Sequence, residues 1–260
     1  MRTEGATVSR TARLSFLGVA AITMSLLAPS LASANHSWGG YHWARTSSPF
    51  TVKLGNNLTG AWGSYLNTTS SDWSQSTVLD TTVVAGGSKG RNCRATTGRV
   101  EVCNGAYGNN GWLGIASISI TGGVHITKAT VRLNDTYFDT PQYNTSAWRN
   151  LVMCQEVGHA FGLDHQDEAF DNANLGTCMD YTNNPASNQH PNAHDYQQLE
   201  TIYAHLDSTT TVGAITPGGS GAADADDFGQ LVRTSQGGYL STFVNDLGAG
   251  ELVVTFIIWA

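Results

Sequence analysis

Apolar residues recur at strand-like and then helix-like spacing in the first half of the chain, which predicts mixed α and β structure. Residues 50–54 read as a first strand, and Trp62, Leu66 and Trp73 follow at a spacing that places them on one helix face. Short apolar segments come next, separated by Gly- and Asn-rich turns at 86–87 and 109–111. The further predicted strands are 81–85, 100–103, 114–120 and 125–133.

Two more helices are predicted after these strands. One begins near Thr145 or Ser146, either of which can cap a helix, and it would bury Trp148, Leu151 and Val152. The other covers about residues 192–206. This order of elements predicts an α+β fold class.

The end of the chain differs in composition. Residues 208–225 are rich in Ser, Thr and Gly and have linker composition. The apolar segments 231–232, 239–244 and 252–259 then read as three strands joined at Gly-rich turns. A β-meander of about 35 residues is too small for secure independent stability. We therefore expect this C-terminal β appendage, 226–260, to pack on the preceding domain or to help bind a surface.

The start of the chain has the pattern of a signal peptide. Arg2, Arg10 and Arg13 precede an apolar stretch over 14–27, and the small residues Ala32-Ser33-Ala34 suit cleavage after Ala34. A membrane anchor is the alternative, but the apolar stretch is short and contains Thr and Ser. The sequence predicts a secreted protein with a signal peptide at 1–34 and no membrane attachment after cleavage.

Charge argues against a nucleic-acid partner. Cleavage after Ala34 would remove three arginines and Glu4, which leaves 10 of the 13 basic and 19 of the 20 acidic residues, a net charge near −9. No basic run or stripe offers contacts to phosphates. The remaining length suits one well-cored domain, which we expect to be a monomer.

Candidate metal chemistry lies in the segment 155–165, which reads Gln-Glu-Val-Gly-His-Ala-Phe-Gly-Leu-Asp-His. Positions 155 and 159 are one helical turn apart, so Gln155 and His159 face the same way and can hold one ion. Gly162 can turn the backbone sharply at the helix end, which would bring His165 back as a third ligand. Glu156 lies beside these residues as a candidate base.

This segment resembles the zinc signature H-E-x-x-H-x-x-G-x-x-H of the metzincin metalloproteases, with glutamine in place of the first histidine. Its second half is most similar to the matrixin-type branch. That clan places a methionine turn after the third ligand, and the segment 177–181, Thr-Cys-Met-Asp-Tyr, contains Met179 at a plausible distance. The resemblance covers roughly residues 48–207. It implies a metzincin-like domain at 35–207, with a twisted mixed sheet over the active-site helix and a lower lobe that carries the Met-turn and a last helix.

The resemblance also implies roles for single residues. His159, His165 and Gln155 would bind Zn²⁺, Glu156 would act as general base and acid, and Tyr181 would steady the oxyanion. The substrate would be a polypeptide that pairs with an edge strand above the cleft. Either 114–120 or 125–133 could be that strand.

Glutamine at position 155 weakens the expected zinc site. Its carbonyl oxygen is neutral, as imidazole is, but it is a poorer donor, and loss of even an outer-sphere partner costs roughly 10- to 100-fold in metal affinity. His125, His190 and His194 are alternative third ligands. The chain is therefore expected to be a secreted zinc-dependent endopeptidase, with a catalytically silent, peptide-binding protein of the same fold as the alternative.

The cysteines predict disulfides. All four follow the predicted cleavage site, and an even number in an oxidising compartment favours two bridges with three possible pairings. We prefer Cys93–Cys103 and Cys154–Cys178, because the second bridge would hold the Met-turn against the metal helix. A four-cysteine zinc site is the alternative, but no C-x-x-C pair is present.

Acidic residues close to the signature are candidate Ca²⁺ ligands, as secreted metzincins often bind calcium. They do not have the spacing of an EF-hand loop, so a solvated acidic loop is the alternative. The residues are Asp164, Asp167, Glu168 and Asp171.

Overall fold

The computed structural model describes Met1 and residues 36–214, 228–235 and 237–260. The chain divides into two compact units, 1–33 and 34–260, and the description below concerns the second. The predicted signal peptide and most of the predicted linker lie outside the described residues. Within the described residues, no helix is both long enough and apolar enough to cross a bilayer.

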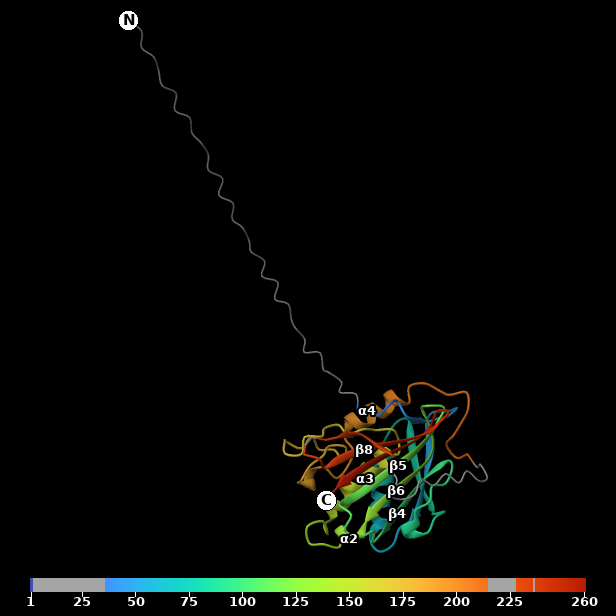
Figure 1. Ribbon diagram of the computed structural model, residues 1–260. Helices are drawn as coiled ribbons and strands as arrows, with labels where there is room; N and C mark the ends of the chain where they lie inside the picture. Colours follow the sequence, from blue (N-terminus) through green and yellow to red (C-terminus); the bar gives the residue numbers. More distant parts are fainter. Residues whose placement is uncertain (2–35, 215–227, 236) are drawn as a thin grey trace. The chain divides into compact units, whose positions relative to one another are not determined.

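A mixed sheet forms the centre of the second unit (Figure 1), with strands in the order β3-β2-β4-β6-β5-β9-β8-β7 and β1 paired to β6. The pairs among β1, β2, β3, β4 and β6 are parallel, whereas β5 is antiparallel to both of its neighbours. The strands are β1 His42–Trp43, β2 Phe50–Asn57, β3 Leu79–Ala85, β4 Arg99–Gly105, β5 Trp112–Thr121, β6 His125–Asn134, β7 Gln230–Thr234, β8 Leu240–Gly248 and β9 Glu251–Trp259. Mixed α and β structure with a mixed sheet is thus confirmed.

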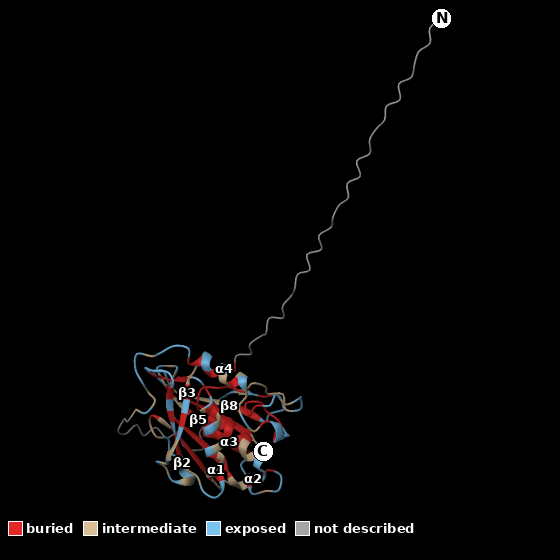
Figure 2. Cartoon of the chain, turned by 180° about the vertical axis from the view of Figure 1, so that it is seen from behind, coloured by how far each residue is buried: buried red, intermediate tan, exposed pale blue. Residues whose placement is uncertain are grey.

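Two long helices pack together. Helix α1, Trp62–Trp73, buries the three residues that the sequence placed on one face, and helix α3, Ser146–His159, is buried continuously from Leu151 to its end (Figure 2). The indole nitrogen of Trp73 donates a hydrogen bond to the carbonyl of Cys154 at 3.2 Å and so ties α1 to α3. Trp148 was expected to be buried, but it is only half-buried. It lies near the exposed start of α3.

Shorter helices complete the unit. They are α2 Asp135–Phe138, α4 Ala193–Ile202, and the 3-10 turns η1 Gly90–Asn92 and η2 Pro185–Ser187. Asn192 caps α4 through a capping box with Asp195. The helix predicted to extend to residue 206 therefore begins where expected but ends at Ile202.

The C-terminal strands continue the main sheet. β9 pairs antiparallel with β5 along almost the whole length of both strands, from Trp112 opposite Trp259 to Ile120 opposite Leu252, and β8 and β7 follow outward. Val254, Phe256 and Ile258 of β9 belong to the same hydrophobic core as α3. The three predicted strands therefore form, and they share a core with the domain that precedes them.

Two disulfides are present, in the pairing that the sequence favoured. Cys93–Cys103 staples η1 to β4, and Cys154–Cys178 joins α3 to the loop that carries Met179. The sulfur of Met179 lies against Gly158 of α3, where an added Cβ would come within 2.6 Å of it. The Met-turn segment is thus fixed beneath α3 by one covalent bond and by close packing.

Candidate metal centre

Helix α3 presents the first part of the candidate site from its buried C-terminal half. Thr145 caps the helix by accepting a hydrogen bond from the amide of Trp148. Gln155, Glu156 and His159 then fall on its last turns, and all three are fully buried. Such burial of three polar side chains is costly unless they have partners, so their surroundings decide what the site can do.

The chain reverses direction directly after α3. Gly162 has φ +92°, and a side chain there would collide with the carbonyl oxygen of Tyr41. This turn brings His165 back over the helix, with its Nε2 atom 3.0 Å from Nε2 of His159. The role predicted for Gly162 from its position in the motif agrees with this conformation.

The remaining ring nitrogens have partners that set the tautomers. Nδ1 of His159 donates to the carbonyl of Leu163 at 2.9 Å, and Nδ1 of His165 faces the carboxylates of Asp164 and Glu168 at 3.5 and 3.7 Å. Burial lowers the pKa of His159 to about 3, whereas Asp164 and Glu168 raise the pKa of His165 despite its burial. The two Nε2 atoms therefore face one another with at most one proton, from His165, between them. Lone pairs 3.0 Å apart repel unless a proton or a cation lies between them.

A zinc ion satisfies this arrangement. Tetrahedral zinc with Zn–N bonds of about 2.0–2.1 Å separates its ligand atoms by about 3.3 Å, close to the observed spacing. The carboxylates behind His165 and the carbonyl behind His159 are the outer partners that metal-binding histidines usually have. The donor set of His159 and His165 therefore fits a zinc ion.

Gln155 and Glu156 have polar atoms without partners. Neither side-chain polar atom of Gln155 and neither carboxylate oxygen of Glu156 makes a well-formed hydrogen bond within the described residues. Burial raises the pKa of Glu156 well above its usual value, and the backbone of Ala116 on β5 offsets this only in part. A buried polar pair that lacks protein partners is the expected state of groups that serve a ligand or a metal.

Strand β5 lies directly over this part of α3. A Cβ atom at Gly114 would come within 2.6 Å of both Oε1 of Glu156 and the side chain of Val152, so the strand can approach the helix only with glycine at this position. β5 is therefore the strand above the site, but the prediction that it or β6 forms an edge was wrong, because β6 lies between β4 and β5, and β5 lies between β6 and β9. The outer edge of β5 is paired with β9.

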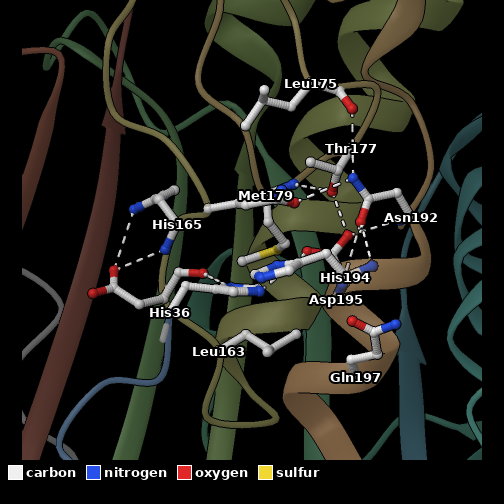
Figure 3. Close-up of polar contacts among 12 residues, drawn as sticks. His36, Leu163, His165, Leu175, Thr177, Met179, Asn192, His194, Asp195 and Gln197 are labelled. Carbon is white, nitrogen blue, oxygen red and sulfur yellow. Dashed lines mark hydrogen bonds and ion pairs between the residues drawn. The ribbon is translucent and has the colours of Figure 1, made fainter. Parts of the chain in front are cut away.

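The Met-turn segment is held by polar contacts (Figure 3). The amide of Met179 donates to the hydroxyl of Thr177 at 3.0 Å, and its carbonyl accepts from the amide of Gln166 at 2.6 Å. Thr177 in turn donates to Asp195 of α4. The residues after His165, the Met-turn and α4 thus form one connected network below the site.

Tyr181 is buried close to Glu156 but is bonded elsewhere. Its hydroxyl donates to the carbonyl of Tyr239 at 3.0 Å, next to β8, and lies 3.5 Å from the carbonyl of Trp259. Burial raises the pKa of this phenol, and the charge of Glu156 contributes to the increase. The C-terminal part of the chain thus accepts the hydrogen bond of the Tyr181 hydroxyl, the group for which the resemblance implies an oxyanion role.

The alternative third ligands lie in other environments. His190 is paired with Asp72, His194 stacks on His36, and His125 faces Asp207. Within the described residues, none of the three makes a hydrogen bond, an ion pair or a ring contact with His159 or His165. Gln155 therefore remains the candidate that the helical spacing gives for the third position.

Three of the four candidate calcium ligands have protein partners, and the fourth, Asp171, is exposed. Arg233 of β7 pairs with both Asp164 and Glu168. Burial would raise the pKa of both carboxyls, but His165 and, to a smaller extent, Arg233 lower it below its usual value. Asp167 accepts hydrogen bonds from the amide of Ala169 and from Asn172. The guanidinium of Arg233 supplies the positive charge that a bound cation would have supplied. Asp164 and Glu168 are therefore neutralised from within the chain.

Sequence reasoning missed the contribution of the C-terminal strands to this site. Arg233 and Phe256 both reach it from beyond residue 228. One signal was present in the sequence. Residues 252–259 are apolar almost without interruption, which is typical of a strand buried on both faces with neighbours on both sides.

Comparisons with known proteins leave the family open. No protein-family model and no curated protein matches the chain. Among solved structures, the crystal structure of myroilysin is similar to 68% of this chain over 97% of its own length, with 15% identity and a TM-score of 0.34. A TM-score of this size establishes no shared fold.

Proposed function

We propose that this protein is a secreted zinc-dependent endopeptidase. The observation that carries the proposal is the pair of Nε2 atoms of His159 and His165, 3.0 Å apart, with a fully buried Glu156 on the same helix as His159 whose carboxylate oxygens have no well-formed hydrogen bond. His159, His165 and Gln155 would hold the zinc ion, which when bound polarises a carbonyl and makes water more acidic. The predicted signal peptide and the two disulfides support export to an oxidising compartment.

The chain's own residues supply the proton transfers in this proposal. Glu156, with a pKa raised by burial, suits a group that takes a proton from the attacking water and passes it to the leaving amine. Once β9 is displaced, strand β5 would offer backbone groups for pairing with an extended peptide, which supports a polypeptide substrate. Tyr181 could donate to the developing oxyanion once its hydroxyl is released from the carbonyl of Tyr239.

One observation favours the second candidate, a silent peptide-binding protein. β9 already pairs with the edge of β5, and Phe256 covers His159. Either candidate must release the edge of β5 before a peptide can pair with it, but only the enzyme also needs Phe256 to uncover His159.

Metal analysis and hydrolysis of unfolded casein test the proposal, with and without a chelator. Both the intact chain and the chain cut within residues 215–227 are assayed at saturating zinc. We expect hydrolysis that the chelator abolishes and that Glu156→Ala lowers by at least about 10²-fold while zinc content stays nearly unchanged. Glu200→Ala, which removes an exposed carboxylate on α4, is the matched control. Zinc-independent hydrolysis, or none in either form, would contradict the proposal.

A further inference from the structure

A second group of metal-ligating side chains lies where three separate segments meet. His42 is on β1, His125 is the first residue of β6, and His205 and Asp207 follow α4. β1 and β6 are parallel and place His42 directly opposite His125. None of these four residues belongs to the His159–His165 site.

Three imidazoles lie around one carboxylate oxygen of Asp207. Oδ1 of Asp207 lies 3.5 Å from Nε2 of His42, 3.3 Å from Nε2 of His125 and 3.6 Å from Nε2 of His205. Nε2 of His42 is also 3.2 Å from Nε2 of His205. Ligand atoms of His42, His205 and Asp207 all lie within 4.8 Å of one another, which suits one ion, whereas His125 is not part of that group and faces Asp207.

Outer contacts direct the donor atoms inward. Nδ1 of His42 donates to the carbonyl of Gly40 at 2.8 Å, which leaves Nε2 of the neutral ring with a lone pair toward the group. Oδ2 of Asp207 accepts from the amide of Arg45 at 3.0 Å and faces the Arg45 guanidinium at 3.6 Å. Asp207 therefore presents its other oxygen to the histidines, and such outer partners are characteristic of built metal sites.

An ordinary ion-pair cluster accounts for this arrangement less well. One carboxylate oxygen cannot satisfy three neighbouring imidazoles, and two Nε2 atoms 3.2 Å apart need a proton or a cation between them. His42 is buried, whereas the side chain of His205 is 53% exposed, so an ion has a route from solvent. Two imidazoles and one carboxylate suit zinc, and imidazole also suits copper and nickel.

We propose that His42, His205 and Asp207 bind one divalent transition-metal ion, zinc by preference, with His125 as an outer partner of Asp207. A water molecule would complete the four-coordinate shell. The ion would join β1 to the segment after α4. The bound ion would thereby stabilise the end of the sheet where these segments meet.

The test counts zinc equivalents bound by the full chain after chelator treatment and dialysis. The variants are His205→Ala, which removes the most exposed ligand, the double variant His159→Ala/His165→Ala, and the control His190→Ala, which removes an exposed histidine paired with Asp72. Thermal unfolding with and without zinc is recorded for each, because an ion that binds only the folded state raises the melting temperature. Absorption of Co²⁺-loaded protein reports a four-coordinate site independently of activity.

We expect His205→Ala to lose one equivalent of zinc and at least about tenfold in affinity at this site, with a smaller zinc-dependent rise in melting temperature. The double variant and the control should keep this equivalent and the Co²⁺ bands. His205→Gln, which retains a weak donor, serves as a second variant should His205→Ala fold poorly. Equal stoichiometry and equal melting shifts in wild type and His205→Ala overturn the proposal. If the only equivalent is lost in His205→Ala and kept in the double variant, this site stands and the zinc-peptidase proposal fails.

Discussion

The ring of Phe256 on β9 lies parallel to the imidazole of His159 on α3, with centroids 4.4 Å apart and planes 8° from parallel. An aromatic side chain from the C-terminal strands thus covers a candidate metal ligand. The same strands pair with the outer edge of β5 and accept the hydroxyl hydrogen bond of Tyr181. His159, the outer edge of β5 and the Tyr181 hydroxyl, which were expected to serve a metal or a substrate, therefore all contact the C-terminal part of the chain.

Cutting the chain between the two parts should raise activity. With a specific protease sequence inserted between Gly219 and Ser220, cleavage removes the link that keeps β9 at a high effective concentration near β5. Peptide hydrolysis by the fragment-free protein should increase at least about tenfold, because a larger fraction of molecules can bind a peptide. The uncut insertion variant is the control. Unchanged activity after complete removal of the fragment would show that β9 does not limit access.

Replacing Gln155 with histidine should strengthen the first metal site. The substitution offers three imidazoles without changing the charge, and zinc affinity should rise by at least about tenfold. A competition titration with a chromogenic chelator measures the affinity. Gln197→His, on the exposed face of α4, controls for an added surface histidine. Equal affinities in Gln155→His and wild type would mean that residue 155 does not touch the metal.

Removing the disulfide between α3 and the Met-turn should destabilise the protein. Cys154→Ala/Cys178→Ala opens a loop with a sequence separation of 24 residues, which should lower the free energy of unfolding by about 2–4 kcal/mol. Urea unfolding under non-reducing conditions measures the change, and peptide mapping should recover the two cysteines of the wild type as one linked species. Recovery of free thiols at both positions would rule out the bridge.

Asp195 should make stability depend on pH between about 4 and 6. Burial raises its pKa to about 6, although Thr177 and the amide of Asn192 donate to it, and the charge of Asp180 adds to the increase. The folded state therefore favours the neutral carboxyl. Its contribution to stability is complete below the unfolded pKa of about 3.9 and is lost as pH rises through about 6.

Asp195→Asn tests this dependence. Asparagine imitates the neutral carboxyl, since its amide can face Nε2 of His36, which lies 3.6 Å from Oδ1 of Asp195. The variant should gain up to roughly 2–3 kcal/mol relative to wild type between pH 4 and pH 7. Urea unfolding across this range measures the difference, with the exposed Asp139→Asn as control. A stability difference that does not change with pH would contradict the assigned titration.

Local features of the fold were predictable because they depend on residues close in sequence. The spacing of Trp62, Leu66 and Trp73 gives the buried face of α1, and Thr145 and Asn192 cap helices near the predicted positions. The meeting of His159 with His165 follows from one helical turn and one glycine. Such features need no knowledge of distant strands.

The remaining features depend on contacts between segments far apart in sequence. Pairing of β5 with β9, the approach of Arg233 to Asp164 and the meeting of His42 with His205 each join residues that periodicity treats separately. His42 and His205 also lack a short motif that would have connected them. Their relationship appears only when β1 and the segment after α4 are placed side by side.

The pairing of β9 with β5 also changes which strand forms the rim of the sheet. Without β7, β8 and β9, the rim would be β5, a ten-residue strand with buried isoleucines and a full row of unpaired backbone groups. With them, the rim is β7, five residues long and mostly exposed, with an arginine among them. Long apolar rims recruit strands from other molecules, whereas short charged ones resist this. Any step that opens the metal centre by removing the C-terminal strands therefore also exposes a surface prone to aggregation, so the opened form should remain soluble only at low concentration or with a peptide in place.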